Sequence, residues 1–366
     1  MDIKKIDLNM ATNYLSVDKL NWIQVNDNNF VLKGGLFFKE NKSFHRLPET
    51  IETRPNLITL GKHSSGIYFD FKTNSTAISL KIDILSKAYM AHMAATGQNG
   101  FDLYFKNKGK WIFLATTKVN LESYTLTLIK DLKPAVREYR LYFPLYNEVK
   151  DIYLGIDEDA NIKKIASKEE RIVFYGTSIT QGGCATRPGI NYTSLLGRKL
   201  NLEAINFGFS GNCHLDKAML DILKEIKNMK YLILEPESNL TNEMLKEKLP
   251  PFLKELKNSL KKTEIILISA FPQPVTLIKN EAKENYLKRK EFQKQLCLDL
   301  NIRFLDGFKI LKKLNYEETV DGIHLTDLGF YNLYLYLNKY LRNLKWCLHI
   351  QSKNKLQLMI FLKVFI

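Results

Sequence analysis

Up to about residue 160, apolar and polar positions alternate along the chain. Between residues 78 and 84, Ile and Leu occupy every second position, and Ser, Lys and Asp lie between them. This period of two is typical of a strand with one face toward a core. Asn, Asp, Gly and Lys turns interrupt it about every ten residues, which favours an antiparallel β-sandwich and predicts no helix in this half. Further strands are expected at 66–71, 101–105, 111–114 and 139–143.

From about residue 168 the pattern changes. Short apolar runs now alternate with segments in which apolar residues recur every three to four positions, as they do along one face of an amphipathic helix. Alternating strands and helices predict a parallel sheet with helices on both faces, where ligands bind beyond the carboxyl ends of the strands. The expected strands are 172–175, 204–207, 231–234, 265–268 and 302–305. The expected helices are 191–200, 215–226, 242–260 (kinked or broken at Pro250 and Pro251), 279–299 and 326–341.

The two patterns, in a chain of 366 residues, predict an α/β protein with two domains. Residues 1–165 are expected to form the β-sandwich, as an accessory domain. Residues 166–345 are expected to form a three-layer α/β/α domain around the parallel sheet. Residues 346–366 fit neither pattern, and we assign no structure to this tail.

The distribution of charged residues along the chain bears on whether the protein binds nucleic acid. The formal net charge is +15, but Lys residues are dispersed among Glu residues, as at 246–248 and 283–284, rather than gathered with aromatic residues in one basic stripe. This distribution is typical of solvated helix faces, so no nucleic-acid partner is expected. Hydrophobic residues make up 45% of the chain and charged residues 25%, which is ordinary for a soluble globular protein.

Cysteine spacing and the chain ends bear on cellular location, membrane insertion, and metal or disulfide sites. The N-terminal segment 1–7 lacks the apolar run of a signal peptide, which favours a cytoplasmic location. The apolar run 356–366 is too short to cross a bilayer, so no membrane span is expected. The cysteines show no CxxC or Cys/His ligand spacing, so neither a metal site nor a disulfide framework is expected, and no cofactor is implied. They are Cys184, Cys213, Cys297 and Cys347.

Two short motifs carry candidate chemistry. The apolar strand 172–175 leads into a turn that contains Ser178, and the last part of the chain contains Asp321-Gly322-Ile323-His324. A serine hydroxyl is a weak nucleophile unless an adjacent base takes its proton, and that base needs a third group to hold its tautomer. Ser178, His324 and Asp321 can supply these three roles. Taken alone, Ser178 would equally suit a helix N-cap.

Four segments of the C-terminal half form a series, each at a predicted strand end or turn. They read Gly176-Thr177-Ser178-Ile179-Thr180-Gln181-Gly182-Gly183, then Asn206-Phe207-Gly208-Phe209-Ser210-Gly211-Asn212, Glu235-Pro236-Glu237-Ser238-Asn239, and Asp321-Gly322-Ile323-His324-Leu325-Thr326-Asp327-Leu328-Gly329. In this order they resemble the sequence blocks of the SGNH (GDSL-like) hydrolases. The resemblance implies that Ser178 is the nucleophile, His324 the base and Asp321 its orienting partner. It assigns the oxyanion hole to the backbone N–H groups of Ser178 and Gly211 and to the side-chain amide of Asn239.

The match departs from the family pattern in two places. Thr177 stands where Asp is commoner, and Ser238 precedes Asn239 where Pro is usual. Asn212 therefore remains a second candidate for the side-chain donor of the oxyanion hole.

Two further residues are candidates for substrate contact. Arg187 follows the nucleophile closely, and it either contacts substrate or fixes its own loop. His214 follows Gly211 closely and is a candidate for lining the pocket.

Segments of the N-terminal half, 44–48, 97–104 and 142–147, resemble the β-sandwich modules that precede SGNH domains in certain bacterial esterases. The resemblance implies either carbohydrate binding or completion of the active-site wall. A purely structural module is the alternative.

Together the sequence predicts a metal-independent serine esterase that cleaves carboxylic esters through an acyl-serine intermediate. The expected partner is a small-molecule or saccharide ester, and an acylated carbohydrate is the preferred substrate. Two other functions stay open: an acyltransferase on the same fold, and a non-catalytic carbohydrate-binding protein. Relatives with this architecture are often exported, in contrast to the location expected from the N-terminus. The acyl chain, the alcohol and the oligomeric state are left open.

Overall fold

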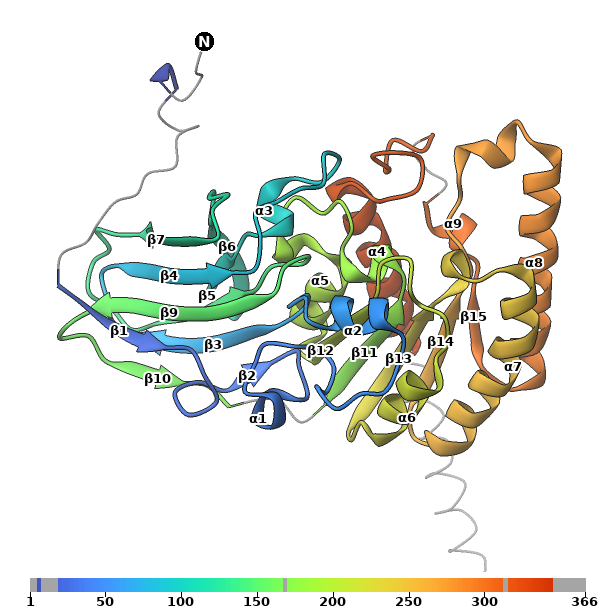
Figure 1. The fold of residues 1–366 in the computed structure, drawn as a ribbon, viewed down its shortest axis with the longest axis horizontal. Coiled ribbons are helices and arrows are strands. Elements are labelled where there is room, and N and C mark those ends of the chain that lie inside the picture. Colours follow the sequence, from blue (N-terminus) through green and yellow to red (C-terminus); the bar gives the residue numbers. More distant parts are fainter. Residues whose placement is uncertain (1–4, 8–18, 167–169, 312–314, 345–366) are drawn as a thin grey trace, which may run out of the picture.

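The structure is a computed structural model of the 366-residue chain, and it describes residues 5–7, 19–166, 170–311 and 315–344. The expected tail at 346–366 lies outside the described residues. Figure 1 shows two layers of strands at one end of the molecule and a helix-covered sheet at the other.

The N-terminal half forms two antiparallel sheets, as its alternating pattern predicts. Their apolar faces meet in a core of aromatic and branched side chains that includes Phe69, Phe71, Ile82 and Leu154. Within the described residues, one sheet has the order β1-β9-β4-β7 and the other β10-β3-β8-β5-β6, with β2 paired to β3. The strands are β1 (Leu20–Gln24), β2 (Leu32–Lys33), β3 (Tyr68–Thr73), β4 (Ile78–Ile84), β5 (Asp102–Asn107), β6 (Lys110–Thr116), β7 (Ser123–Ile129), β8 (Arg137–Tyr142), β9 (Val149–Asp157) and β10 (Ile162–Lys164).

The expectation that this half contains no helix is wrong. The described part of this half has three short ones: α1 (Phe38–Asn41), α2 (Pro55–Gly61) and α3 (Ala95–Gln98). In α2, Pro55 occupies the first turn, where a missing N–H costs nothing, and Leu57 is fully buried. Helices this short owe their stability to tertiary packing, so they leave little periodic signal in the sequence.

The C-terminal half forms a parallel sheet covered by helices, as predicted. Within the described residues its strand order is β12-β11-β13-β14-β15. These strands are β11 (Arg171–Gly176), β12 (Glu203–Gly208), β13 (Met229–Glu235), β14 (Glu264–Ile268) and β15 (Arg303–Leu305). The helices are α4 (Ser178–Gln181), α5 (Tyr192–Leu200), α6 (Lys217–Glu225), α7 (Asn242–Ser259), α8 (Asn280–Asp299), α9 (Gly307–Leu311) and a last helix at 327–344, with short 3₁₀ turns at Pro188–Ile190, Glu237–Asn239 and Pro274–Leu277.

Successive residues of the strands enter different cores on the two faces of the parallel sheet. On one face Phe174 and Ile233 pack with α5 and the last helix. On the other, Val173 and Leu232 pack with α6, α7 and α8. Helices thus bury both faces, which explains why these strands read as continuous apolar runs rather than alternating ones.

The long helix expected at 242–260, with a kink or a break at Pro250 and Pro251, is not broken there. Helix α7 runs from Asn242 to Ser259 with Pro250 and Pro251 inside it. Its buried face, which includes Leu249 and Leu253, lies in the core beneath the sheet. This packing holds the segment helical although proline removes backbone donors.

The two halves share their cores. Leu47 and Leu57 of the N-terminal half pack in the core on the α6–α8 face, and Met93, Leu145 and Tyr146 pack in the core on the α5 face. The N-terminal half therefore buttresses both faces of the parallel sheet.

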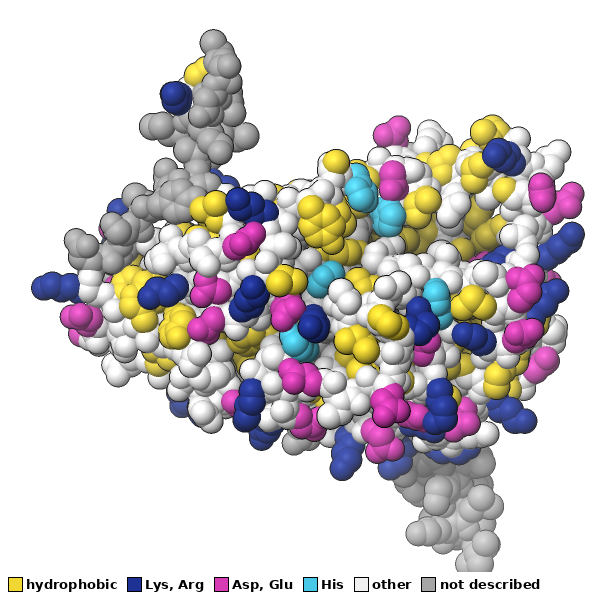
Figure 2. All heavy atoms as spheres, in the orientation of Figure 1, with side chains coloured by type: hydrophobic (Ala, Val, Ile, Leu, Met, Phe, Trp, Pro, Cys, Tyr) yellow, Lys and Arg dark blue, Asp and Glu magenta, His cyan; other side chains and the backbone are white. Residues whose placement is uncertain are grey.

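On the face shown in Figure 2, Lys and Arg side chains are interspersed with Asp and Glu, in keeping with the dispersed charge of the sequence. Among the described residues, no helix combines the length and the apolar character that crossing a membrane would require.

Candidate active site

Ser178 occupies a tight turn at the carboxyl end of β11. It is the first residue of α4, and the side-chain oxygen of Thr177 caps this helix by accepting a hydrogen bond from the Ile179 N–H at 3.3 Å. The helix ends at Gly182, whose φ of 111° lies in the left-handed region that glycine adopts without steric cost. Because α4 has only four residues, its dipole at Ser178 is that of a single turn.

The structure brings Ser178, His324 and Asp321 into one hydrogen-bonded chain. His324 Nε2 lies 3.0 Å from Ser178 Oγ, and His324 Nδ1 lies 2.7 Å from Asp321 Oδ2. Ser178 is only 9% exposed, whereas the side chains of His324 and Asp321 are 24% and 35% exposed. The hydroxyl is therefore held within reach of a base that solvent and a ligand can also reach.

Asp321 is fixed by its own loop. Its second oxygen, Oδ1, accepts hydrogen bonds from the backbone N–H groups of Ile323 at 2.9 Å and His324 at 2.7 Å. Burial acts to raise the pKa of Asp321, but the hydrogen bonds from His324 and from these N–H groups outweigh it and lower the pKa below its ordinary value. The carboxylate stays ionised and can stabilise a protonated imidazole on His324.

The expected oxyanion donors Gly211 and Asn239 lie at the carboxyl ends of the two strands that flank β11. Gly211 has a φ of +65°, and a Cβ added there would meet no described atom within 4 Å, so open space lies over this turn. Asn239 Oδ1 accepts a hydrogen bond from the Cys213 N–H at 3.1 Å. This contact orients the Asn239 side chain and leaves its amide nitrogen, on the other branch, as the donor. That both serve an oxyanion stays a prediction.

Asn212, the second candidate for the side-chain donor, is engaged at both ends of its amide. Its Oδ1 accepts from Arg54 Nη1 at 2.8 Å, and its Nδ2 donates to the Ser210 carbonyl at 2.9 Å. Arg54 also forms two hydrogen bonds with Asp216, each 2.9 Å long. These contacts favour Asn239 over Asn212, because the Asn212 amide nitrogen already has an acceptor.

Of the two roles expected for Arg187, its contacts are those of a residue that fixes its loop. Arg187 Nη1 donates to Asp102 Oδ2 at 2.9 Å and to Tyr104 Oη at 2.6 Å, and its guanidinium lies 3.8 Å from the Phe113 ring centroid. Asp102 also accepts from the Gly189 N–H at 2.8 Å. The N-terminal domain therefore holds the loop that follows the nucleophile.

His214 contacts the turn that carries Gly211. Its Nε2 lies 3.1 Å from the Gly211 carbonyl oxygen. Partial burial and the positive charge of Arg54 lower the pKa of His214. Its role in substrate contact stays a prediction.

Arg46 is a further functional candidate, which no sequence motif indicates. This fully buried side chain reaches from the N-terminal domain to the end of β12, where it donates to the carbonyls of Asn206 at 3.0 Å and Gly208 at 2.7 Å. Two further donors bind the carbonyls of His63 and Leu60, each at 2.7 Å. Burial lowers the pKa of Arg46 to about 9. Arg46 lies in segment 44–48, which resembles the β-sandwich modules of certain esterases. That resemblance indicates the type of N-terminal domain, not a residue that contacts the active-site turns.

Gln181 connects the nucleophile turn with the Gly211 turn. Its Oε1 accepts from the Ser210 N–H at 2.9 Å, and its Nε2 lies 3.0 Å from His63 Nδ1. Burial, and then the charge of Arg46, lower the pKa of His63 to about 3, so His63 is neutral and its Nδ1 can accept the amide proton. The relative position of Ser178 and Gly211 thus depends on residues of both domains.

Glu235, at the end of β13, lies beneath the nucleophile. Its Oε2 accepts from the Thr177 N–H at 3.2 Å, from Thr177 Oγ1 at 2.7 Å and from Thr180 Oγ1 at 3.2 Å. Its Oε1 has no hydrogen-bond partner among the described residues. Burial raises the pKa of Glu235 to about 7, although the Thr177 and Thr180 bonds act to lower it. Glu235 belongs to the third sequence block, but no sequence pattern indicates a role for it.

Two family models match this chain, and the boundary between the matched segments lies where the β-sandwich gives way to the parallel sheet. Residues 169–345 match the model of the GDSL-like lipase/acylhydrolase family. Residues 20–162 match the model of the N-terminal domain of SGNH hydrolase-type esterases. A comparison with curated protein sequences found no match.

Solved structures share the whole two-domain arrangement. A protein from Bacteroides ovatus described as a GDSL-like lipase is 29% identical, with a TM-score of 0.80 over 90% of this chain and 98% of its own. A salicylyl-acyltransferase from a tetracycline biosynthetic pathway is 14% identical, with a TM-score of 0.67 over 90% and 99%. A family two carbohydrate esterase from Cellvibrio japonicus is 11% identical, with a TM-score of 0.58 over 89% and 98%. The last two share the fold.

Proposed function

We propose that this protein, which belongs to the GDSL-like lipase/acylhydrolase family, is a serine esterase. It hydrolyses carboxylic esters through an acyl-serine intermediate. The observation that carries the proposal is the hydrogen-bonded chain from Ser178 Oγ through His324 to Asp321. Each of the three groups that covalent catalysis by serine needs is in contact with the next.

In the first half of the reaction, Ser178 Oγ attacks the ester carbonyl while His324 Nε2 takes the hydroxyl proton. The imidazolium is stabilised by Asp321, whose lowered pKa keeps it ionised. The carbonyl oxygen becomes an oxyanion, which the N–H groups of Ser178 and Gly211 and the amide of Asn239 stabilise. When the C–O bond to the alcohol breaks, the leaving oxygen takes the proton from Nε2, and the acyl group remains on Ser178.

In the second half, water attacks the acyl-serine and gives its proton to His324 Nε2. The tetrahedral intermediate collapses, Ser178 Oγ leaves and takes that proton back, and the carboxylic acid departs. An alcohol in place of water would complete an acyl transfer by the same steps. Hydrolysis and acyl transfer should both be measured, because an acyltransferase shares this fold.

We propose an acylated carbohydrate as the substrate, since the family two carbohydrate esterase from Cellvibrio japonicus shares the fold. We further propose that the N-terminal domain builds the active site rather than acting as a separate sugar-binding module. Arg46 and Arg54 contact the segment that leads to and follows Gly211, and Asp102 fixes the loop after the nucleophile. A domain with this many contacts to the catalytic loops is part of the site.

The test combines covalent labelling with turnover. A fluorophosphonate should label wild type and leave Ser178→Ala unlabelled. A panel of sugar and simple alkyl esters with increasing acyl length identifies the preferred acyl group, and the same panel with an excess of a sugar alcohol separates hydrolysis from transfer by product. Absence of both labelling and ester cleavage in the folded wild-type protein would overturn the proposal.

A further inference from the structure

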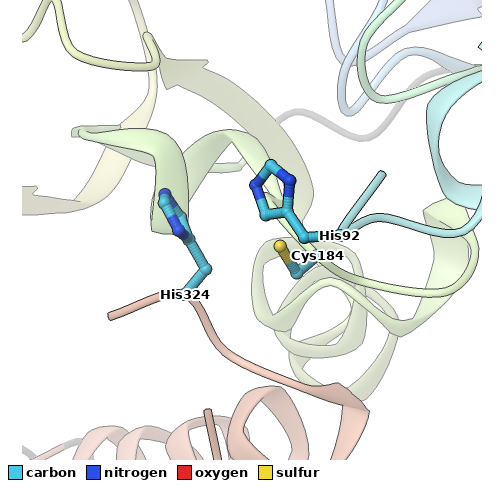
Figure 3. Close-up of side chains that lie close together, drawn as sticks. All are labelled: His92, Cys184 and His324. Atoms are coloured by element: carbon cyan, nitrogen blue, oxygen red, sulfur yellow. The ribbon is translucent and has the colours of Figure 1, made fainter. Parts of the chain in front are cut away.

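Beside the catalytic triad, three residues with metal-ligating side chains meet from distant parts of the chain. They are His92, between β4 and α3, Cys184, after α4, and His324, and their ligand atoms all lie within 4.8 Å of one another. Figure 3 shows the two imidazole rings and the thiol close together, and the ring centroids of His92 and His324 are 5.7 Å apart. Their separation along the chain explains why ligand spacing in the sequence did not reveal them.

His324 is prepared for coordination by its partner Asp321. The Nδ1 atom is 2.7 Å from Asp321 Oδ2, so Nε2 is the ring nitrogen that can coordinate a metal ion. A carboxylate bonded to the other ring nitrogen is the usual arrangement behind a metal-binding histidine, because it fixes the tautomer and raises the basicity of the ligand. The contact that serves catalysis would serve metal binding equally well.

Cys184 is held beside His324 by a compact turn. Its φ of 73° lies in the left-handed region that glycine would adopt more easily, yet the chain places a thiol there. The preceding Gly183 donates to the Ser178 carbonyl at 2.7 Å, and a Cβ added to Gly183 would lie 3.3 Å from His324 Cδ2. The turn therefore packs against the catalytic histidine and fixes the position of the buried thiol.

We propose that His92, Cys184 and His324 form a binding site for Zn²⁺ and that its occupation inhibits the serine chemistry. Two imidazoles and a thiolate are ligands that zinc prefers. A tetrahedral ion with Zn–N bonds of about 2.0–2.1 Å and a Zn–S bond of about 2.3 Å needs its ligand atoms about 3.3–3.6 Å apart. His92 is exposed, so rotation of its side chain can close the remaining distance.

The mode of inhibition follows from the atoms involved. On binding, Cys184 loses its thiol proton to solvent, and the Nε2 lone pair of His324 forms a bond to the ion. That lone pair can no longer accept the proton of Ser178 Oγ, 3.0 Å away. With three protein ligands, the fourth position is left to water, which suits an exchangeable, inhibitory ion rather than a structural one. The inhibitory part rests on the proposed function, whereas binding itself does not.

Binding is tested with Co²⁺, which takes zinc sites and absorbs light when a thiolate coordinates it. The full-length Ser178→Ala protein should develop the thiolate-to-cobalt charge-transfer band on titration, and Zn²⁺ should remove the band by displacement. The band should be lost in Ser178→Ala with Cys184→Ser, and retained with Cys297→Ser, which changes another buried cysteine. No band, or a band that persists without Cys184, would overturn the site.

Inhibition is tested on otherwise wild-type protein with the best ester of the panel. Zn²⁺ should suppress turnover and a chelator should restore it. Cys184→Ser and His92→Ala should each turn over without metal and need at least about tenfold more Zn²⁺ for half-inhibition. His45→Ala, at a histidine in contact with Glu148, should respond as wild type does. Equal zinc sensitivity in all four proteins would overturn the proposal. A Cys184-dependent cobalt band in a protein that cleaves no ester would support the site and overturn the proposed function instead.

Discussion

Arg46 Nη1 donates a hydrogen bond of 2.7 Å to the carbonyl oxygen of Gly208, the last residue of β12. Arg46 belongs to the N-terminal domain, and Gly208 leads directly into the turn that presents Gly211. The same guanidinium lies 4.7 Å from the centroid of the Phe209 ring. A buried cation of one domain therefore fixes the backbone that precedes the proposed oxyanion donor of the other.

Replacing Arg46 with Lys should lower both activity and stability. Lysine keeps the charge but cannot reproduce the planar arrangement of donors that binds carbonyls of Asn206, Gly208, His63 and Leu60. Each buried carbonyl left without a donor costs about 1–3 kcal/mol. Misplacement of the Gly211 turn should lower kcat by up to about 10²-fold, with a smaller change in KM.

The measurements are steady-state kinetics and urea unfolding on the same sample. Arg137→Lys provides the matched control, because Arg137 lies on β8 and its guanidinium binds the carbonyl of Ala135 in its own segment. We expect it to behave as wild type. A wild-type kcat for Arg46→Lys would show that Arg46 has no influence on the oxyanion turn.

The sequence predicts features that depend on local periodicity or on short spacing. The strand expected at 78–84 coincides with β4, since every second side chain there enters the core. Asp321 contacts His324 because both lie in one turn. In contrast, Arg46 binds backbone carbonyls, which carry no side-chain signature, and Asn206 lies 160 positions away. Helix α2 and the approach of His92 to Cys184 likewise depend on tertiary packing that no window of sequence contains.

The triad should behave as a unit. Ser178→Ala and His324→Ala should each lower kcat by about 10⁶-fold, and the double variant should be little worse, because neither residue acts without the other. Asp321→Ala should lower kcat less, by about 10⁴-fold. Asp321 Oδ1 also accepts hydrogen bonds from two backbone N–H groups, so Asp321→Ala should in addition lower the free energy of unfolding.

Initial rates with the best ester, together with unfolding midpoints, check these expectations. Ser238→Ala is the control: it removes an exposed hydroxyl beside Asn239 and should leave turnover close to wild type. Activity of Ser178→Ala near the wild-type value would refute the assignment of the nucleophile.

Glu235 should make the stability depend on pH. Its folded-state pKa of about 7 lies above the ordinary value of 4.5, so the folded state binds a proton more tightly than the unfolded state. Its contribution is fully present below pH 4.5 and is lost as pH rises through 7. Across that window the loss amounts to about 3 kcal/mol.

The difference in unfolding free energy between wild type and Glu235→Gln isolates this contribution from His63, whose lowered pKa acts with the opposite sign. Measured by urea unfolding at several pH values, the advantage of wild type over Glu235→Gln should shrink as pH rises from 4.5 to 7. A difference that is constant over this range would mean that the pKa of Glu235 does not change on folding.

Asn239 provides the sharpest test of the oxyanion hole, because its two polar atoms have separate partners. Oδ1 accepts from the Cys213 N–H, whereas the amide nitrogen is the proposed donor to the oxyanion. Asn239→Asp keeps an acceptor for Cys213, removes the donor and places a negative charge that faces the oxyanion. It should lower kcat by at least about 10²–10³-fold, equivalent to about 2.7–4 kcal/mol, with little change in KM, since the contact forms in the transition state.

Asn239→Ala removes both contacts, so it should lose a similar factor in kcat and also some stability, about 1–3 kcal/mol for the unpaired Cys213 N–H. Asn212→Ala is the comparison, because the Asn212 amide nitrogen already donates to Ser210. Measuring kcat and the unfolding midpoint for the three variants separates donation from structure. If Asn239→Asp turned over normally while Asn212→Ala did not, the side-chain donor would be Asn212, and the turn held by Arg54 would be the one that binds the oxyanion.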